Sequence, residues 1–377
     1  MQGARSRLKF VLFACTPALA LFIGAELFVR TAIFVHPALV SIPLPGEGKL
    51  LVPDAELFWS LRPSNRVRYL DALVATDAHG LRSPPIEPRQ PREFRILSLG
   101  ESTTFGSRVQ IEETYTLRLA DELQSLEGDA GGIRVFTAIN AGVPAYSSFQ
   151  SLEYLKRRGL ALEPDLVLIY HELNDYMPST LRDSSHDEIG VLMTDARLHA
   201  MQSSWLHRIA ESSALVRFLR LRLASRAVES FDLPEDQEML EASVPEIGLS
   251  SVGVRPRVHA WGDRADGHAR FDEFALGQRV SESERLAHLQ AFARIADEQG
   301  IELVLIHPSY QATERHECLL TRFAGEHDVA LFDAHAALHP RERLEDALFL
   351  DSWHPSPLGH ARLASELATF VWERIQP

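Results

Sequence analysis

The feature that most constrains the fold is a series of five short, unbroken apolar runs that begins at residue 94. They are FRILSL (94–99), IRVFTAI (133–139), DLVLIYH (165–171), ELVLIH (302–307) and VALFD (329–333). Each run is continuous rather than alternating, which is typical of parallel strands that are covered on both faces. Segments with helical spacing lie between the runs, so the sequence predicts strands that alternate with helices.

Apolar residues in the intervening segments recur at the spacing of one helix face. The three faces are Tyr115, Leu119, Leu123 and Leu126; Leu286, Leu289, Phe292, Ile295 and Ala296; and Ala364, Leu367, Val371 and Ile375. Gly300 follows the second of them and supplies a helix stop. We therefore expect an α/β fold with three α/β/α layers. Its five-stranded parallel sheet should have the flavodoxin-like order 2-1-3-4-5 and right-handed crossovers.

This domain is predicted to fill residues 94–377, with an insertion at 176–280 between the third and fourth strands. The insertion contains a basic and apolar helical stretch and an acidic segment with prolines. We interpret it as a lid or substrate-recognition subdomain. Residues 31–93 are rich in proline and contain short alternating pieces, so they are predicted to be a spacer with short strands.

The N-terminus, residues 1–30, is predicted to be a membrane anchor. Three basic residues within 1–9 precede an apolar run at 10–29, which is about as long as a bilayer-spanning helix. A basic flank before the span favours a cytoplasmic N-terminus and a single-pass protein whose main domain is extracytoplasmic. Glu26 lies near the far end of the run, where a carboxylate costs less.

Three other interpretations of this segment stay open. Ala18-Leu19-Ala20 resembles a signal-peptide cleavage site, which would make the protein secreted. A lipoprotein attached through Cys15 is the second alternative, and a buried N-terminal helix is the third.

Composition excludes several classes of function. The 377 residues carry a formal net charge of −14, which disfavours nucleic acid as a partner. The chain has two cysteines, one of them in the apolar N-terminal run, so a disulfide framework is excluded. No Cys/His spacing predicts a zinc site, and neither a metal nor a cofactor is expected.

Polar and small residues follow the first three predicted strands, at the sheet edge where open α/β proteins form sites. Ser102 lies in LGESTTFG, directly after the first strand. Gly142 and Ala145 follow the second strand, and Asn174 follows the third. Taken singly, Ser102 and Asn174 are equally explained as helix caps, and the glycine as an ordinary tight turn.

Near the C-terminus, FLDSWHPSPLGH places Asp351 three residues before His354 on a loop. A nucleophilic serine needs a base, and the base needs an acid to fix its tautomer. This loop supplies both, although it is also explained as a solvated turn between prolines.

Together these segments resemble the SGNH (GDSL-like) hydrolases over roughly residues 94–375, apart from the insertion. The matching blocks are Gly100-Glu101-Ser102, NAGVPAYSS at 140–148, Glu172-Leu173-Asn174-Asp175 and Asp351-Ser352-Trp353-His354. The resemblance implies that Ser102 is the nucleophile, His354 the base and Asp351 its orienting acid. It also implies an oxyanion hole built from the backbone N–H groups of Ser102 and Ala145 and the Asn174 side chain.

Three positions depart from the family pattern. Glu101 replaces the usual Asp, Ala145 stands where Gly is usual, and Glu172 replaces the Gly of the third block. A carboxylate at Glu172 opposes a developing oxyanion unless it points away or is paired. With Gly142 and His307, these two glutamates are candidates to line a pocket.

The resemblance implies a serine esterase or acylhydrolase that acts on O-acyl or O-acetyl esters of cell-envelope carbohydrate or lipid. An O-acyltransferase that modifies an exported polysaccharide is the first alternative. A catalytically silent glycan-binding or assembly protein on the same fold is the second. The sequence indicates neither the acyl chain length nor the oligomeric state.

Overall fold

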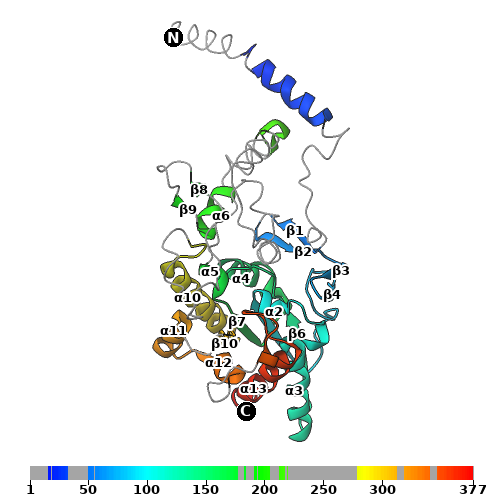
Figure 1. Cartoon of the computed structure of the whole chain (residues 1–377), viewed down its shortest axis with the longest axis vertical. Helices are drawn as coiled ribbons and strands as arrows, with labels where there is room; N and C mark the ends of the chain where they lie inside the picture. The colour runs from blue at the N-terminus through cyan, green and yellow to red at the C-terminus, as the bar shows by residue number, and fades with distance from the viewer. Residues whose placement is uncertain are drawn as a thin grey trace.

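The computed structural model describes residues 16–17, 19–32, 50–54, 56–176, 182–183, 191–192, 194–203, 212–216, 219, 278–311, 318–339 and 346–376. At its centre is a parallel sheet of β5 (Glu93–Gly100), β6 (Val135–Asn140), β7 (Leu166–Tyr170), β10 (Glu302–His307) and β11 (Ala330–Asp333). The strands lie in the order β11-β10-β7-β5-β6 (Figure 1). Numbered along the chain, this is the predicted order 2-1-3-4-5, so the predicted sheet is confirmed.

Helices cover both faces of the sheet, as the continuous apolar strands predict. On one face lie α3 (Tyr115–Asp129), α12 (Ala334–Leu338) and α13 (Pro357–Ile375), and on the other lie α4 (Ser148–Tyr154), α10 (Glu282–Gln299) and α11 (Leu319–His327). The three-layer α/β/α class is therefore confirmed. Further helices of the described residues are α2 (Ser102–Phe105), α5 (Leu173–Tyr176) and α6 (Asp195–Ser203).

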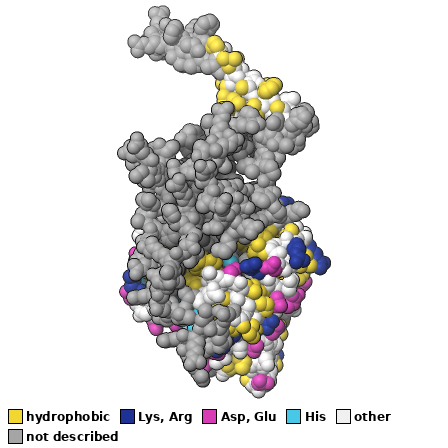
Figure 2. Space-filling model, in the orientation of Figure 1, with side chains coloured by type: hydrophobic (Ala, Val, Ile, Leu, Met, Phe, Trp, Pro, Cys, Tyr) yellow, Lys and Arg dark blue, Asp and Glu magenta, His cyan; other side chains and the backbone are white. Residues whose placement is uncertain are grey.

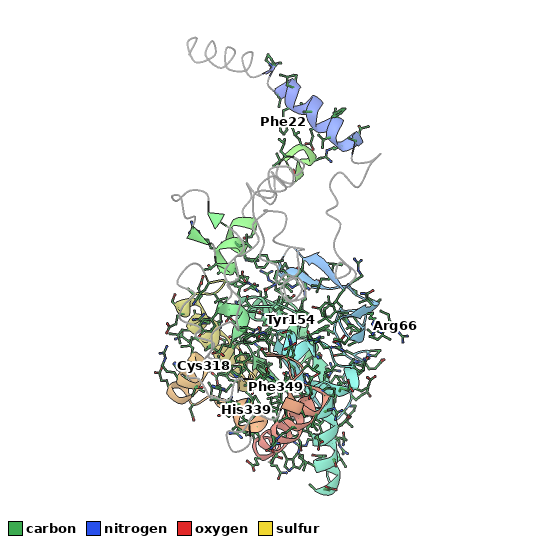
Figure 3. All side chains as sticks on the ribbon, viewed as in Figure 1. Phe22, Arg66, Tyr154, Cys318, His339 and Phe349 are labelled. Atoms are coloured by element: carbon green, nitrogen blue, oxygen red, sulfur yellow. The ribbon has the colours of Figure 1, made fainter. Side chains whose placement is uncertain are left out.

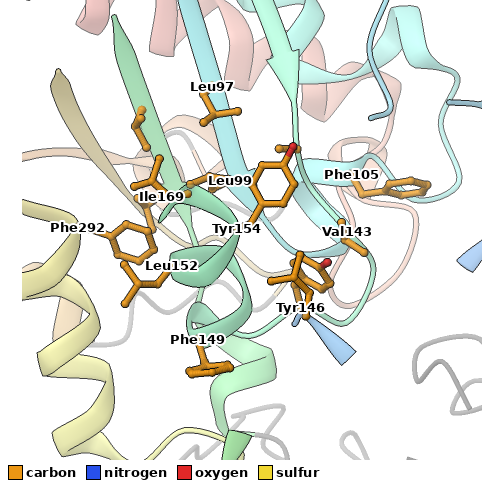
Figure 4. Packing of buried hydrophobic residues seen from close by; sticks show 14 of the residues in the cluster. Leu97, Leu99, Phe105, Val143, Tyr146, Phe149, Leu152, Tyr154, Ile169 and Phe292 are labelled. Carbon is orange, nitrogen blue, oxygen red and sulfur yellow. The ribbon is translucent and has the colours of Figure 1, made fainter. Parts of the chain in front are cut away.

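Alternate residues of each strand point to the two faces, which produces two apolar clusters. Leu97 and Leu99 of β5 pack with Phe292 of α10, and Figure 4 shows these side chains beside α4 (Figure 4). Ile96 of the same strand belongs to the opposite cluster, with Leu119 of α3. Strands buried on both faces hold the carboxyl edge of the sheet rigid, and that edge carries the site described below.

Helix boundaries follow local chemistry. At the start of α10, Ser281 caps the helix and forms a capping box with Glu284. The helix ends at Gly300, which has a φ of +65°, so the predicted stop is confirmed. Ser356 caps α13, and Pro357 occupies its first turn.

The described part of the proline-rich segment forms two antiparallel hairpins. They are β1 (Leu51–Asp54) with β2 (Phe58–Leu61), and β3 (Arg66–Tyr69) with β4 (Ala72–Ala75). Trp59 of β2 is buried in the same apolar cluster as the sheet. These hairpins therefore contribute to the main apolar core, whereas a segment that served only as a spacer would not need to pack there.

At the N-terminal end, residues 19–32 are helical, and hydrophobic side chains gather on this helix in Figure 2 (Figure 2). Phe22 lies on it, far from the sheet in Figure 3 (Figure 3). Among the described residues, no helix combines the length and apolarity that crossing a membrane requires. Residues 1–15 and 18 of the predicted anchor, Cys15 included, lie outside the described part.

Most of the predicted insertion also lies outside the described residues. Its described parts include β8 (Arg182–Asp183), β9 (Val191–Leu192) and α6. Glu26 of the N-terminal helix accepts hydrogen bonds from the backbone N–H groups of Ala214 and Leu215, at 2.8 and 2.9 Å. The carboxylate that interrupts the apolar run is thus hydrogen-bonded to the insertion.

Candidate active site

Ser102 lies at the carboxyl end of the central strand, where β5 passes into α2. A side chain at Gly100 would not fit in this turn, because a Cβ there would lie 2.7 Å from the Tyr170 carbonyl oxygen of β7. The helix ends after one turn at Gly106, whose φ is +80°. Ser102 is half-buried, so its hydroxyl lies at the sheet edge where such folds bind ligands.

His354 lies between Ser102 and Asp351 and is hydrogen-bonded to both. Its Nε2 is 2.9 Å from Oγ of Ser102, across a sequence separation of 252 residues. Its Nδ1 is 2.9 Å from each carboxylate oxygen of Asp351. An imidazole that donates from Nδ1 to a carboxylate has Nε2 as an acceptor, which is the tautomer able to take a hydroxyl proton.

Asp351 and His354 lie on the loop at residues 349–355, which we call the His354 loop. Hydrogen bonds among the loop's own residues order it. Leu350 donates its N–H to the His354 carbonyl oxygen at 2.8 Å. Oδ1 of Asp351 accepts the N–H groups of Trp353 and His354, at 2.9 and 2.8 Å. Partial burial would raise the Asp351 pKa, but its hydrogen bonds with the His354 side chain and these N–H groups keep it well below its ordinary value.

Arg108 adds a cation to this side of the site. Its Nη1 lies 3.1 Å from Oδ2 of Asp351, and its Nε lies 2.9 Å from Oδ2 of Asp71. Asp71 lies in the turn between β3 and β4, so Arg108 links this hairpin to the acid beside His354.

The loop after β6, residues 141–147, packs against the helix that begins with Ser102, and we call it the Gly142 loop. A Cβ at Gly142 would lie 2.6 Å from the Thr104 carbonyl carbon and still closer to the Phe105 nitrogen, so only glycine fits. Asn140 donates from Nδ2 to the Thr104 carbonyl oxygen at 2.8 Å. Ala145 has a φ of +62°, a left-handed conformation in which the family's glycine would be unstrained.

Asn174 connects this loop to the strand-end turn of Ser102. Its Nδ2 donates to the Tyr146 carbonyl oxygen at 3.1 Å, which uses one of its two side-chain hydrogens. Its backbone N–H donates to Oε2 of Glu101 at 3.2 Å. The structure therefore brings Ser102, Ala145 and Asn174 to one edge of the sheet.

Three buried acids, Glu101, Glu172 and Asp175, lie on the side of the site that the Gly142 loop and Asn174 form. Burial, with smaller contributions from the other two acids, raises the pKa of Glu101 to about 8, although the Asn174 N–H opposes the shift. Burial also raises the pKa of Asp175 to about 6. Glu101 is therefore mostly a neutral carboxylic acid at pH 7, while Glu172 accepts from the Tyr310 hydroxyl at 3.4 Å.

The remaining pocket candidate, His307, is fully buried at the end of β10. Its Nδ1 lies 3.9 Å from Oδ1 of Asp333 on β11. Across the described ranges, no group of three or more His, Cys, Asp or Glu side chains is arranged to bind a metal ion. Cys318 is a buried free thiol.

Sequence reasoning missed three residues that contact the site from outside the motif blocks. Besides Arg108, they are Trp59 and Arg279, which donate to the Pro144 and Ala145 carbonyl oxygens. Trp59 lies in the segment interpreted as a spacer, and Arg279 lies at the end of the predicted insertion. No local pattern marks either residue, because each acts through a contact between distant segments.

Fold and site together define an α/β/α protein with a Ser–His–Asp constellation at the carboxyl edge of its sheet. Strand order and motif placement agree with the resemblance to the SGNH hydrolases. No family model and no curated protein matches the chain.

Several solved structures are similar to this chain at low identity. One is described as a lipolytic protein of the G-D-S-L family from Desulfitobacterium hafniense, with 12% identity and a TM-score of 0.38 over 73% of this chain and 98% of that one. A GDSL-like lipase from Bacteroides thetaiotaomicron has 11% identity and a TM-score of 0.34, covering 75% and 89%. An acetyl xylan esterase from Geobacillus stearothermophilus has 14% identity and a TM-score of 0.41, covering 74% and 94%.

Proposed function

We propose that this protein is a serine esterase or acylhydrolase that cleaves O-acyl or O-acetyl esters through Ser102, His354 and Asp351. The observation that carries the proposal is the position of His354, with one ring nitrogen 2.9 Å from the Ser102 hydroxyl and the other 2.9 Å from the Asp351 carboxylate. This is the contact geometry that activates a serine nucleophile.

In the acylation step, Nε2 of His354 takes the Ser102 proton while Oγ attacks the ester carbonyl carbon. The imidazolium that forms is stabilised by the ionised Asp351, and it then gives its proton to the departing alcohol oxygen. Water deprotonated by the same nitrogen attacks the acyl-enzyme, and the acid leaves while Ser102 regains its proton. The low pKa of Asp351 supports this role, because the carboxylate stays charged at neutral pH.

The carbonyl oxygen becomes negative during attack, and donors at the sheet edge would stabilise it. We assign this role to the backbone N–H groups of Ser102 and Ala145 and to the second side-chain hydrogen of Asn174. One such donor is typically worth about 10²–10³ in turnover. A neutral Glu101 beside them is compatible with an oxyanion, whereas an ionised one would oppose it.

The test compares the wild type with Ser102→Ala on a short acyl ester and on a fluorophosphonate probe. We expect the variant to lose at least about 10⁴ in turnover and to lose all labelling, with an unchanged melting temperature. Ser352→Ala is the matched control, since Ser352 is an exposed serine near the site. If Ser102→Ala hydrolyses the ester as fast as the wild type, the assignment is wrong.

For the substrate, we propose acyl or acetyl esters on cell-envelope carbohydrate or lipid. The basic flank and apolar run at the N-terminus support a membrane anchor with the sheet domain on the extracytoplasmic side. Protease accessibility in intact and permeabilised cells tests that orientation. Adding polysaccharide acceptors during turnover separates hydrolysis from acyl transfer, because only a transferase moves the acyl group to the glycan.

A further inference from the structure

We propose that Trp59 and Arg279 are positioning residues, which bind the carbonyl groups on either side of the Ala145 N–H and so aim it at the reacting ester. The inference rests on the proposed function, because it concerns an oxyanion donor. It assigns a role in the reaction to two segments outside the motif blocks, the β1–β2 hairpin and the end of the insertion.

Trp59 acts on the peptide group that contains the Ala145 N–H. Its Nε1 donates to the Pro144 carbonyl oxygen at 3.3 Å, and its ring is fully buried. The C=O and N–H of a trans peptide point in opposite directions, and the described chain has no cis peptide. A fixed Pro144 carbonyl therefore fixes the direction of the Ala145 N–H.

Trp59 is itself fixed by the Gly142 loop. The Tyr146 hydroxyl donates to the Trp59 carbonyl oxygen at 2.7 Å, and the two rings pack edge to face. Figure 4 shows Tyr146 and Val143 of this loop within the apolar cluster. Loop and hairpin thus hold each other in place.

Arg279 binds the carbonyl that follows the same N–H. Its Nη1 donates to the Ala145 carbonyl oxygen at 2.6 Å, and its Nη2 donates to Gln150 at 2.6 Å and to Asp195 at 2.8 Å. Arg279 is 6% exposed, and Asp195 is 3% exposed. A planar guanidinium suits this task, because its N–H donors have fixed positions relative to one another. Binding to Gln150 and Asp195 therefore also fixes the donor that binds the Ala145 carbonyl oxygen.

Ala145 needs this support more than a glycine would. With a φ of +62°, it lies in the left-handed region, which is unfavourable for a residue that carries a Cβ. Such conformations persist only where the surroundings impose them. Without a partner for its carbonyl, Ala145 would relax toward negative φ, and the adjoining peptides would rotate.

The two supports also meet each other and the insertion. Cζ of Arg279 lies 5.4 Å from the centre of the Trp59 ring, within cation–π range. Asp195 donates its N–H to the Arg279 carbonyl oxygen at 2.8 Å, so two distant points of the insertion are joined beside the Gly142 loop. The hairpin and the insertion therefore converge on the two adjoining peptides that flank Ala145.

The experiment uses full-length Arg279→Gln and follows kcat and KM for a short acyl ester. We expect kcat to fall by about 10–100-fold with KM nearly unchanged, because an oxyanion donor acts in the transition state. Arg95→Gln is the matched control. Like Arg279, Arg95 is a buried arginine that donates to backbone carbonyls, here those of Leu162 and Glu87. It lies near the amino end of β5, whereas Ser102 follows the carboxyl end. This control should keep wild-type kcat.

Ala145→Gly separates positioning from general damage. Because glycine adopts positive φ without strain, the double variant with Arg279→Gln should recover at least about ten-fold in kcat. Trp59→Phe keeps an aromatic side chain but removes the N–H donor, and it should lower kcat several-fold in a protein that still folds, with a melting temperature lowered by the smaller ring. It stays informative if Arg279→Gln does not fold.

Three results would overturn the inference. They are a wild-type kcat in either folded variant, an equal loss in Arg95→Gln, and no rescue by Ala145→Gly. The proposed function would still stand after any of them, because Ser102-dependent turnover would remain in the wild type. Loss of that dependence would overturn both proposals together.

Discussion

The His354 loop and the Gly142 loop lie at the same edge of the sheet, but they are stabilised in opposite ways. The His354 loop is ordered largely from within, by the hydrogen bond from the Leu350 N–H to the His354 carbonyl oxygen and by those from loop N–H groups to the Asp351 carboxylate. Arg108 and Gln311 also contact it from outside. The Gly142 loop depends on partners far away in the sequence, among them Trp59, Arg279 and Asn174. The same catalytic edge therefore combines one element whose acid–base pair is ordered within four residues, which we call the self-contained side, with one that is assembled by the tertiary fold, which we call the assembled side.

This difference determines how each loop responds to changes elsewhere in the molecule. A self-contained acid–base loop keeps its geometry when the surrounding segments change. An assembled donor loop changes its geometry whenever the hairpin or the insertion moves. Substrate-dependent adjustment is therefore expected in the Gly142 loop, and the acid–base pair should be insensitive to such changes.

Asp351→Asn should break the self-contained side with the largest effect. The amide places an N–H donor where the carboxylate accepted from Nδ1 of His354, which favours the wrong tautomer and removes the charge that stabilises the imidazolium. We expect kcat to fall by about 10⁴-fold, equivalent to about 5 kcal/mol. Steady-state kinetics with a short acyl ester measures this loss.

The fold should survive the Asp351→Asn substitution, because the amide oxygen can still accept the Trp353 and His354 N–H groups. Melting temperature and far-UV circular dichroism serve as controls. A loss of turnover smaller than ten-fold would show that the acid does not orient His354 during the reaction.

Gly142→Ala should damage the assembled side with a smaller effect, mainly on stability. The added Cβ would overlap the Thr104–Phe105 backbone, so α2 and Ser102 must shift. Overpacking of this kind costs about 1–3 kcal/mol of unfolding free energy, and turnover should fall as well. Urea unfolding and ester kinetics measure the two effects.

Gly128→Ala is the matched control for Gly142→Ala. Gly128 lies in α3, and nothing lies within 4 Å of a Cβ at that position. There alanine should be neutral or stabilising by up to about 1 kcal/mol. Equal unfolding midpoints for the two variants would contradict the close approach between the Gly142 loop and α2.

The comparison also explains how much of the fold could be predicted. The faces of α3, α10 and α13 and the stop at Gly300 were predictable, because each depends on spacing within one segment. The sheet order was predictable because the alternation of strands and helices indicates a flavodoxin-like class. The role of the proline-rich segment was not, since nothing near Trp59 in the sequence shows that its ring enters the sheet's apolar core.

The same division applies to the site. The pairing of Asp351 with His354 is visible in four consecutive residues. Arg108 and Arg279 became visible only when the fold brought the loop after α2 beside Asp351 and the end of the insertion beside Ala145. The alanine at 145 looked like a tolerable departure, and only its φ shows why it needs support.

The two sides of the site also differ in how they respond to pH. Asp351 has a depressed pKa, so its carboxylate stays charged across the neutral range. Glu101, which accepts from the Asn174 N–H on the other side, has a pKa raised to about 8. It faces Asp175 and Glu172, which oppose its ionisation, and Arg279, which favours it. A change near pH 8 should therefore affect the assembled side first.

Glu101→Gln tests this contrast, with the smallest expected effect. The folded-state pKa of Glu101 lies above the ordinary glutamate value of 4.5, so the folded state binds more protons between the two values. The unfolding free energy then falls as pH rises through that window, by about 1–2 kcal/mol between pH 6.5 and 8. Asp175, with a pKa of about 6, has largely titrated below this range.

Glutamine at position 101 keeps an acceptor for the Asn174 N–H but cannot ionise. Urea unfolding at several pH values should therefore give a flatter slope for the variant than for the wild type. Parallel slopes would mean that Glu101 is already ionised at neutral pH and that the charge beside the oxyanion site must be offset in another way.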